Sequence, residues 1–377
     1  MRFAIITHVP HKLSNGRLAA YGPYVREMNI WGSHVDMIEI VAPFEDGFPD
    51  AIDIEYDHPK IIFRKIPAFD VISSSAKIKV LFKLPKIVWR IATAMRKADH
   101  VHLRCPGNIG LIGCFVQILF PSKPKTAKYA GNWDPKSKQP LSYRLQKLIL
   151  NNAFLTRNMK VLVYGKWEGS SPNIQPFFTA TYNNSDRDRI FERNHHGPLR
   201  LLFVGTLSPG KQPLYALKIA ERLHDLGVET SLDFYGEGKM RDSLETYISE
   251  KGLQDVVRLM GNQNEMTVRG AYKSAHFVLL PSLSEGWPKV LAEAMFWGCV
   301  PVATRISCVP FMLGNGGRGI LMTEDLEKDS KAVLQMYRDA EEYKVISENA
   351  SEWSRQYTLD VFGNEIRKML ESGKIRD

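Results

Sequence analysis

The sequence predicts an α/β protein built from two Rossmann-like, doubly wound domains. A length of 377 residues is typical of two domains of ordinary size. Short apolar runs alternate with segments of helical spacing in both halves of the chain, and this alternation implies parallel strands joined by helical crossovers. A composition of 44% hydrophobic and 24% charged residues is that of a globular protein with real cores.

The C-terminal half shows the alternation most clearly. Its expected strands are 199–207, 231–238, 256–262, 276–282 and 300–304. Its expected helices are 211–226, 239–251, 265–274 and 288–297. Gly227 and Gly252 end the first two helices. We expect one doubly wound domain over 199–355.

The N-terminal half repeats the pattern more loosely. Its expected strands are 3–8, 35–43, 100–106 and 126–132. We expect an N-terminal domain over 1–181, followed by a polar connection over 182–198 that lacks apolar periodicity. The tail from Leu359 to Ile375 has helical spacing, and we expect the segment 356–377 to pack back on the N-terminal domain.

Composition excludes several classes of protein. The first residues, MRFAIITHVPH, are apolar too briefly for a signal peptide, and no run approaches the ~20 apolar residues of a membrane span. The four cysteines lack metal-ligand spacing, so we expect buried free thiols in a reducing compartment and no zinc. The formal charge of +9 favours anionic partners such as phosphates, acidic lipid surfaces or nucleic acid, without choosing among them.

Open parallel sheets bind ligands beyond the carboxyl ends of their strands, so residues just after strands are the candidates for chemistry. The segment from Gly205 and Thr206 to Lys211 joins a strand to a helix start. Glycine lets the backbone approach a ligand, a helix N-terminus offers N–H donors, and Lys211 adds a cation, which together suit a diphosphate. Taken alone, an ordinary turn with a solvated lysine fits these residues better.

Two further loops after strands are less specific. Gly236-Glu237-Gly238 is half of a dinucleotide fingerprint or simply a tight turn. Gly261-Asn262 exposes backbone that can bond a nucleobase edge, and a plain loop is equally consistent. Since no full GxGxxG follows a strand with an acid about twenty residues on, a dinucleotide oxidoreductase is disfavoured.

The segment PSLSEGWPKVLAEAM carries the most information. Glu285 follows a strand and precedes a helix, where it can accept bonds from sugar hydroxyls or simply favour the helix dipole. Glu293 lies in a helix that is apolar nearly all round, and a buried carboxylate needs a partner. Two ribose hydroxyls would satisfy it. The alternative is an exposed ion pair with Lys289 at (i, i+4), which the apolar surroundings disfavour.

At these residues the sequence resembles the retaining glycosyltransferases of family four, which have the GT-B fold. The resemblance rests on two glutamates separated by seven residues, Glu285 and Glu293, within PSLSEGWPKVLAEAMFWGCVPVAT. It extends over roughly 199–325, with Gly-Thr-Leu…Lys, FYGEG and RLMGN in the family's order. The resemblance implies two Rossmann-like domains that face a central cleft, with the acceptor on the N-terminal domain and the nucleotide sugar on the C-terminal one.

The resemblance also assigns roles to individual positions. Lys211 and Glu285 would be the catalytic residues, the first neutralising the departing diphosphate and the second contacting the transferred sugar. Glu293 would hold the donor's ribose. The remaining donor-binding positions would be Gly205, Thr206, Gly286, Trp287, Gly261, Asn262 and, in a loop of the N-terminal domain spanning Ser14 to Gly22, Asn15 and Gly16.

The sequence departs from the family's pattern at three places. Thr206 stands where the family often has arginine, so Lys211 and the helix dipole carry more charge, or Arg305 or Arg104 substitutes. The usual Glu-Gly-Phe-Gly reads Glu-Gly-Trp-Pro, and the proline removes a backbone donor. The glycine pair after the next strand reads Ile-Ser-Cys. These changes weaken any inference about the identity of the donor.

The expected function is therefore transfer of a sugar from a nucleoside diphosphate to a hydroxyl, with retention, in bacterial polysaccharide or glycolipid biosynthesis. Positive potential at the leaving group is the chief catalytic device, so we expect no metal and no cofactor. The family resemblance also implies that no protein nucleophile is obligatory. Arg104 and Asp134 are cleft candidates on the acceptor side, although a structural salt bridge and an Asp-Pro turn explain them as well. A nucleotide-sugar epimerase of the same fold and a non-catalytic nucleotide-sugar-binding protein remain alternatives.

Residues 76–98 suggest contact with a membrane surface. The segment contains seven cations, no acid and many apolar residues, a composition that suits the surface of an anionic bilayer. A helix broken at Pro85 with a solvated basic face is the equally weighted alternative. We expect a cytoplasmic protein, peripheral on the inner face of the membrane if this contact is real, with a carbohydrate or lipid-linked acceptor and no nucleic-acid partner.

Overall fold

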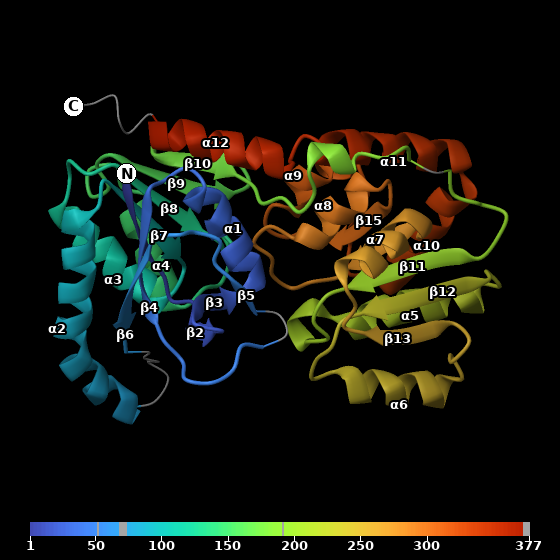
Figure 1. Ribbon diagram of the computed structural model, residues 1–377. Coiled ribbons are helices and arrows are strands. Elements are labelled where there is room, and N and C mark those ends of the chain that lie inside the picture. The colour runs from blue at the N-terminus through green and yellow to red at the C-terminus, as the bar shows by residue number, and fades with distance from the viewer. Residues whose placement is uncertain (51–52, 68–73, 191, 372–377) are drawn as a thin grey trace. The chain divides into compact units, whose positions relative to one another are not determined.

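A computed structural model describes residues 1–50, 53–67, 74–190 and 192–371, without the side chains of 74–82. The chain divides into two compact units, one formed by Met1–Phe177 with Phe362–Asp377, the other by Phe178–Val361. Residues 182–198, which the sequence assigns to a connection, thus belong to the second unit. Figure 1 labels the elements of both units.

The first unit is organised around a seven-stranded parallel sheet with the strand order β10-β9-β8-β7-β1-β4-β6. The strands are β1 (Arg2–Ile6), β4 (Met37–Pro43), β6 (Ile61–Ile66), β7 (His100–Cys105), β8 (Lys125–Tyr129), β9 (Met159–Tyr164) and β10 (Ile174–Phe177). The helices are α1 (Gly22–Gly32), α2 (Ser74–Lys97), α3 (Asn108–Val116), the 3-10 turn η1 (Gln117–Leu119) and α4 (Leu141–Leu150).

The two faces of this sheet have different cores. Helices α2, α3 and α4 share one core with alternate strand residues such as Ala4 and Ile6. The neighbouring residue Phe3 points to the other face, where it stacks on Trp31 of α1 at 5.4 Å. Helix α2 runs through Pro85 without ending, so the break predicted there is wrong.

A small antiparallel sheet corrects the predicted loop from Ser14 to Gly22. Strands β2 (His11–Ser14), β3 (Arg17–Tyr21) and β5 (Asp53–Glu55) form it in the order β2-β3-β5. Asn15 and Gly16 are the two turn residues between β2 and β3, with φ values of 49° and 80°. Positive φ at both positions is the geometry of a type I′ hairpin turn, which Asn-Gly favours.

The second unit contains a six-stranded parallel sheet with the order β13-β12-β11-β14-β15-β16. The strands are β11 (Leu199–Val204), β12 (Thr230–Tyr235), β13 (Val257–Gly261), β14 (Phe277–Leu280), β15 (Val300–Thr304) and β16 (Ile320–Met322). The helices are α5 (Pro213–Asp225), α6 (Arg241–Lys251), α7 (Glu265–Ser274), α8 (Lys289–Phe296), α9 (Val309–Met312), α10 (Leu326–Arg338) and α11 (Ala340–Ser354). Short 3-10 turns are η2 (Asn184–Asp186), η3 (Pro209–Lys211) and η4 (Gly314–Gly316).

The expected doubly wound architecture is confirmed in both sheets. Each of the five strands expected in the C-terminal half is present, and the strand order places β14 beside β11. The last helix, α12, spans Leu359–Glu371, and its residues from Phe362 onward belong to the first unit. The Phe362 ring packs against that of Phe177 at 5.3 Å. Residues 372–375 of the predicted tail helix lie outside the described residues.

Candidate functional site

The structure brings Lys211 and Glu285 together, although 74 residues separate them. Lys211 ends η3 after β11, and Glu285 lies in the loop after β14. Since β11 and β14 are neighbouring parallel strands, both loops emerge at the carboxyl edge of the sheet. The Lys211 ammonium donates to Glu285 Oε1 at 2.5 Å. The amide of Leu283 also donates to the carbonyl of Gly210 at 2.9 Å, which ties the two loops together.

The two members of this pair differ in exposure. The Glu285 side chain is 8% exposed, whereas that of Lys211 is 30% exposed. A carboxylate so far out of water is strongly disfavoured unless a cation accompanies it, and Lys211 supplies that cation. Lys211 keeps enough contact with solvent to meet an anionic ligand. The arrangement thus offers one accessible positive charge beside one enclosed negative charge.

Glycines shape the floor beside this pair. A Cβ on Gly236 would lie 2.0 Å from the carbonyl oxygen of Gly205, and one on Gly238 would lie 2.4 Å from that of Leu207. The amide of Gly236 donates to the carbonyl of Gly261 at 2.8 Å. These glycines are required because neighbouring loops approach one another closely. The packing of the loops therefore accounts for these glycines without a ligand. The same contacts connect the loops after β11, β12 and β13 along one edge of the sheet.

Polar groups along that edge are open to solvent. Thr206 and Asn262 are exposed, and Gly261 is half-buried at the end of β13. Arg305 is exposed directly after β15. The residues assigned to diphosphate and base contact therefore follow β11, β13 and β15, at the carboxyl edge of one sheet.

Glu293 has hydroxyl partners, but the protein supplies them. Thr181 Oγ1 donates to Glu293 Oε1 at 2.7 Å, and the hydroxyl of Tyr272 donates to Oε2 at 3.1 Å. Burial, and then the nearby Glu293 charge, raise the pKa of Tyr272 well above its usual value, so this hydroxyl stays protonated. The hollow beside Glu293 measures only about 10 Å³, near the minimum for one water molecule. Sequence reasoning missed both partners, which lie in a different loop and a different helix.

The side chain of Trp287 is buried against other aromatic rings of the second unit. It is 7% exposed, and its ring lies 6.0 Å from that of Trp353 on α11. Only its backbone and that of Gly286 can therefore line a site. The carbonyl of Gly286 accepts a hydrogen bond from Cys308 Sγ at 2.9 Å, and burial raises the pKa of that thiol to about 12. All four cysteines are free and buried, as the sequence predicts.

In the first unit, Arg104 is engaged in a buried ion cluster. Its Nη1 donates to both carboxylate oxygens of Glu27 at 3.1 Å, and Lys128 Nζ lies 3.0 Å from Glu27 Oε1. This is the structural salt bridge that the sequence left open. Asp134 accepts a bond from the amide of Lys136 at 2.8 Å, which is the turn geometry that was its alternative.

Among the residues described, no group of three His, Cys, Asp or Glu side chains could hold a metal ion. Within the same part of the chain, no helix is both long and apolar enough to cross a bilayer.

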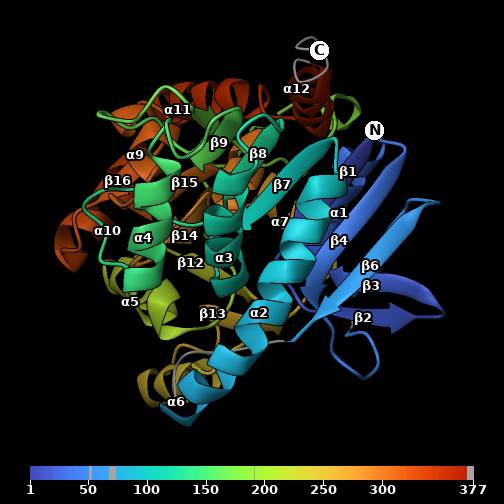
Figure 2. The same ribbon diagram turned by 90° about the vertical axis from the view of Figure 1, so that its left-hand side faces the viewer.

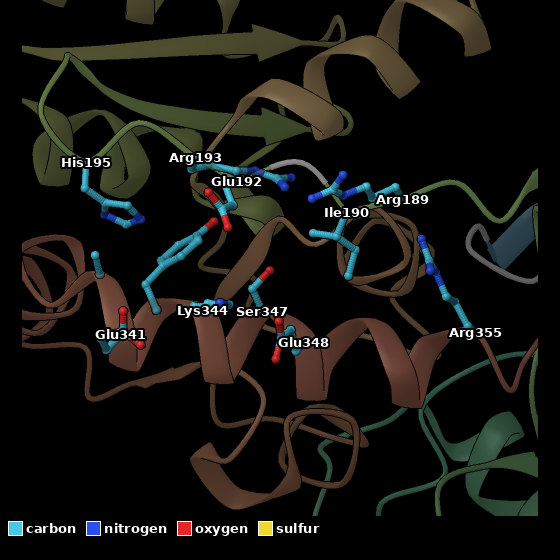
Figure 3. A pocket seen from close by; sticks show the side chains of 12 residues that line it. Arg189, Ile190, Glu192, Arg193, His195, Glu341, Lys344, Ser347, Glu348 and Arg355 are labelled. Carbon is cyan, nitrogen blue, oxygen red and sulfur yellow. The ribbon is translucent and has the colours of Figure 1, made fainter.

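A larger hollow lies elsewhere in the second unit (Figure 3). Its volume is about 530 Å³, and Arg189, Glu192 and Arg193 face Lys344 and other residues of α11 across it. These residues precede β11 and so lie toward the amino end of the sheet. Because ligands of open parallel sheets bind at the carboxyl end, the edge that holds Lys211 and Glu285 is the better candidate.

Comparisons with known proteins find similarity in the second unit. The family model described as Glycosyl transferases group 1 matches residues 184–353. An uncharacterized glycosyltransferase of Methanocaldococcus jannaschii is 25% identical over 200 residues, which are 53% of this chain and 55% of that protein. The amylovoran biosynthesis glycosyltransferase AmsK of Erwinia amylovora is 30% identical over 145 residues, or 37% of this chain and 36% of its own. The chain thus spans about half or less of these relatives' lengths.

A solved structure extends the likeness to the whole chain. HepE of Anabaena, in complex with UDP, superimposes with a TM-score of 0.69 at 14% identity, covering 98% of this chain and 99% of the other. At this identity the likeness concerns the fold, which is GT-B with two Rossmann-like domains. The group 1 match, by contrast, concerns only the second unit and includes Lys211, Glu285 and Glu293.

Proposed function

We propose that this protein is a glycosyltransferase that moves a sugar from a nucleoside-diphosphate sugar to a hydroxyl acceptor, with retention of configuration. The observation that carries the proposal is the ion pair of Lys211 and Glu285 at the carboxyl edge of the second sheet. It lies within the segment that matches the group 1 glycosyl transferases. UDP in the structure of HepE supports a nucleotide donor.

Lys211 suits the diphosphate of such a donor, and Glu285 suits its sugar. The main barrier is separation of the diphosphate from a sugar with oxocarbenium character, so positive potential at the leaving group lowers it. Lys211 supplies a full charge, and α5 adds the partial charge of a helix N-terminus from Pro213. Glu285 accepts hydrogen bonds from the sugar's hydroxyls. When the donor binds, Glu285 keeps Lys211 as its counter-charge, and the exposed side of the Lys211 ammonium meets the diphosphate.

Retention and the absence of a metal requirement are parts of the proposal. Lys211 and the helix dipole can offset the diphosphate charge, and the acceptor's proton can pass to the departing diphosphate oxygen. The relatives' names support an acceptor in polysaccharide assembly. We propose a carbohydrate or lipid-linked acceptor and, from the buried reduced cysteines, a cytoplasmic location.

The test is a screen of the full chain against UDP, GDP and ADP sugars. One nucleotide series should raise the melting temperature, since a ligand stabilises the folded state as its concentration exceeds its Kd. With that donor, NMR of the product should report the donor's anomeric configuration. If no donor raises the melting temperature and no sugar is transferred or hydrolysed, the proposal fails. An epimerase would instead change the sugar without transferring it.

A substitution separates sugar contact from nucleotide contact. Glu285→Gln should retain the thermal shift with the free nucleoside diphosphate and lose most of the transfer. Glu327→Gln is the matched control, because Glu327 pairs with Arg222 on the surface and is 66% exposed. Equal transfer by Glu285→Gln and the control would remove Glu285 from the mechanism.

A further inference from the structure

Helix α4 is apolar on both of its faces. Its inner face contributes Ile149 and Leu150 to the core of the first unit. Leu141, Leu145 and Leu148 lie on the outer face at i, i+4 and i+7, and they are 78%, 39% and 64% exposed. A surface helix normally has polar residues on its outer face. Single exposed leucines are common, but three on one stripe mark an interaction surface.

The apolar surface continues onto the neighbouring turn. Phe154, in the turn after α4, is 72% exposed, and Leu119 at the end of η1 is also 72% exposed. The side chain of Gln117 in η1 donates to the carbonyl of Leu155 at 2.9 Å, which holds these two segments together. We call these five residues the outer apolar face, namely Leu119, Leu141, Leu145, Leu148 and Phe154.

Positive charge surrounds this face without compensating acids. Arg144 lies on the leucine stripe and is exposed, and the Arg157 guanidinium lies 4.6 Å above the Phe154 ring. From residue 135 to residue 167 the sequence contains no Asp or Glu. Within this stretch of the chain, apolar side chains are therefore accompanied by cations and by no acid.

Helix α2 also exposes an aromatic side chain together with cations. Trp89 is 64% exposed, and Lys83, Lys86, Arg96 and Lys97 are exposed. The whole helix, Ser74–Lys97, contains no acid. Figure 2 shows α2, α3 and α4 side by side, in one layer over the sheet. A flat partner can therefore touch α2 and α4 together.

We propose that the outer apolar face of the first unit, together with the exposed basic side of α2, docks on an anionic membrane surface. Leucines and phenylalanine enter the boundary between headgroups and acyl chains, and the cations meet lipid phosphates. Tryptophan favours the same interface. A second copy of the chain is a poor occupant, because a symmetric contact would set these cations against one another. This inference goes beyond sugar transfer and does not depend on it.

The test measures sedimentation of the full chain with vesicles. Phosphatidylcholine vesicles with a one-third share of phosphatidylglycerol should bind the protein at low salt, and phosphatidylcholine alone should bind it weakly. The variant Leu141→Gln/Leu145→Gln/Leu148→Gln keeps good helix formers and should lower the partition coefficient by about tenfold or more, because three apolar side chains no longer enter the lipid. The matched control is Leu226→Gln/Val345→Gln, which replaces exposed apolar residues of the second unit and should bind like the wild type.

A second variant tests the same surface without changing the leucines, in case the leucine variant does not fold. Arg144→Gln/Arg157→Gln should reduce binding several-fold at low salt and have less effect at high salt, where surface charges are screened. The proposal is overturned if the wild type does not sediment with anionic vesicles, or if the leucine variant binds as well as its control. It is also overturned if the leucine variant turns a dimer into a monomer, since the face would then be a protein interface. A retained thermal shift with donor in the leucine variant separates this outcome from failure of the proposed activity.

Discussion

Each unit holds a prominent ion pair, and the two differ in burial. In the second unit, Lys211 is 30% exposed beside the enclosed Glu285. In the first unit, Glu27, Arg104 and Lys128 are 6%, 14% and 1% exposed. The Lys128 ammonium also lies 5.0 Å from the Phe362 ring and 5.5 Å from that of Phe177. The first-unit cluster is almost entirely out of water, whereas the second-unit pair keeps one charge available.

This difference separates a structural role from a functional one. A buried cluster pairs its charges among its own members, and removing one member leaves uncompensated charge. A pair at the carboxyl edge of a sheet can bind a ligand through its accessible member. The first type should therefore govern stability, and the second should govern activity.

The largest effect on stability should come from Glu27→Gln. Two buried cations would lose their shared counter-charge, and we expect a loss of about 3–5 kcal/mol in the free energy of unfolding. Urea denaturation of the variant and the wild type measures it. Glu365→Gln is the control, because its pair with Lys368 is exposed on both sides and should contribute less than about 1 kcal/mol. Equal effects of the two substitutions would mean that the cluster is not structural.

Lys211→Gln should show the opposite behaviour. Losing the cation at the leaving group should slow transfer by about 10²–10³-fold, the usual effect of removing one stabilising donor from such a site. The free energy of unfolding should fall less than it does in Glu27→Gln, because Lys211 is partly exposed and the glutamine amide can still donate to Glu285. Rates and denaturation curves of the same preparation test both expectations. Lys251→Gln should alter neither, because the Lys251 side chain is 52% exposed and lies 3.8 Å from Glu221.

The pH dependence of the free energy of unfolding should also show that the Glu27 cluster has a structural role. Burial alone would raise the pKa of Glu27, but Arg104 and Lys128 together lower it from 4.5 to about 2. An acid with a depressed folded-state pKa stabilises the protein above its unfolded pKa, and that contribution is lost as pH falls through the folded value. The wild type should therefore lose on the order of 3 kcal/mol between about pH 4.5 and pH 2 from this group. In that window its unfolding free energy should approach that of Glu27→Gln, and a constant gap would contradict the assignment.

The sequence alone predicts those parts of the candidate site that follow from the order of strands and helices. Glu285 and Lys211 are each adjacent to an apolar run, and loops after neighbouring parallel strands must meet at one edge. The hairpin of β2 and β3 was missed, although Asn15-Gly16 is a strong local signal for such a turn. Its strands are short, and an extended polar loop fits the same residues.

Contacts between distant segments could not be predicted. Glu27 lies in a helix beside the apolar residues Tyr24, Val25 and Met28, the same pattern that singled out Glu293. The pattern indicates that such a carboxylate needs a partner, and both have one in the structure. It does not tell whether that partner is a cation, a protein hydroxyl or a ligand, because the partner comes from another element. Burial and partner identity therefore need coordinates.

The smallest effect concerns Glu293, whose assignment to a ribose stays a prediction. Thr181→Val removes one hydroxyl and keeps the side chain's shape, so we expect a loss of about 1 kcal/mol in stability. If a ribose also bonds Glu293, the freed oxygen makes donor binding equal or tighter, whereas Glu293→Gln weakens it. Donor titrations of the two variants distinguish these effects. Weaker donor binding by Thr181→Val would instead mean that Thr181 itself contacts the donor, because nothing else about the carboxylate has changed.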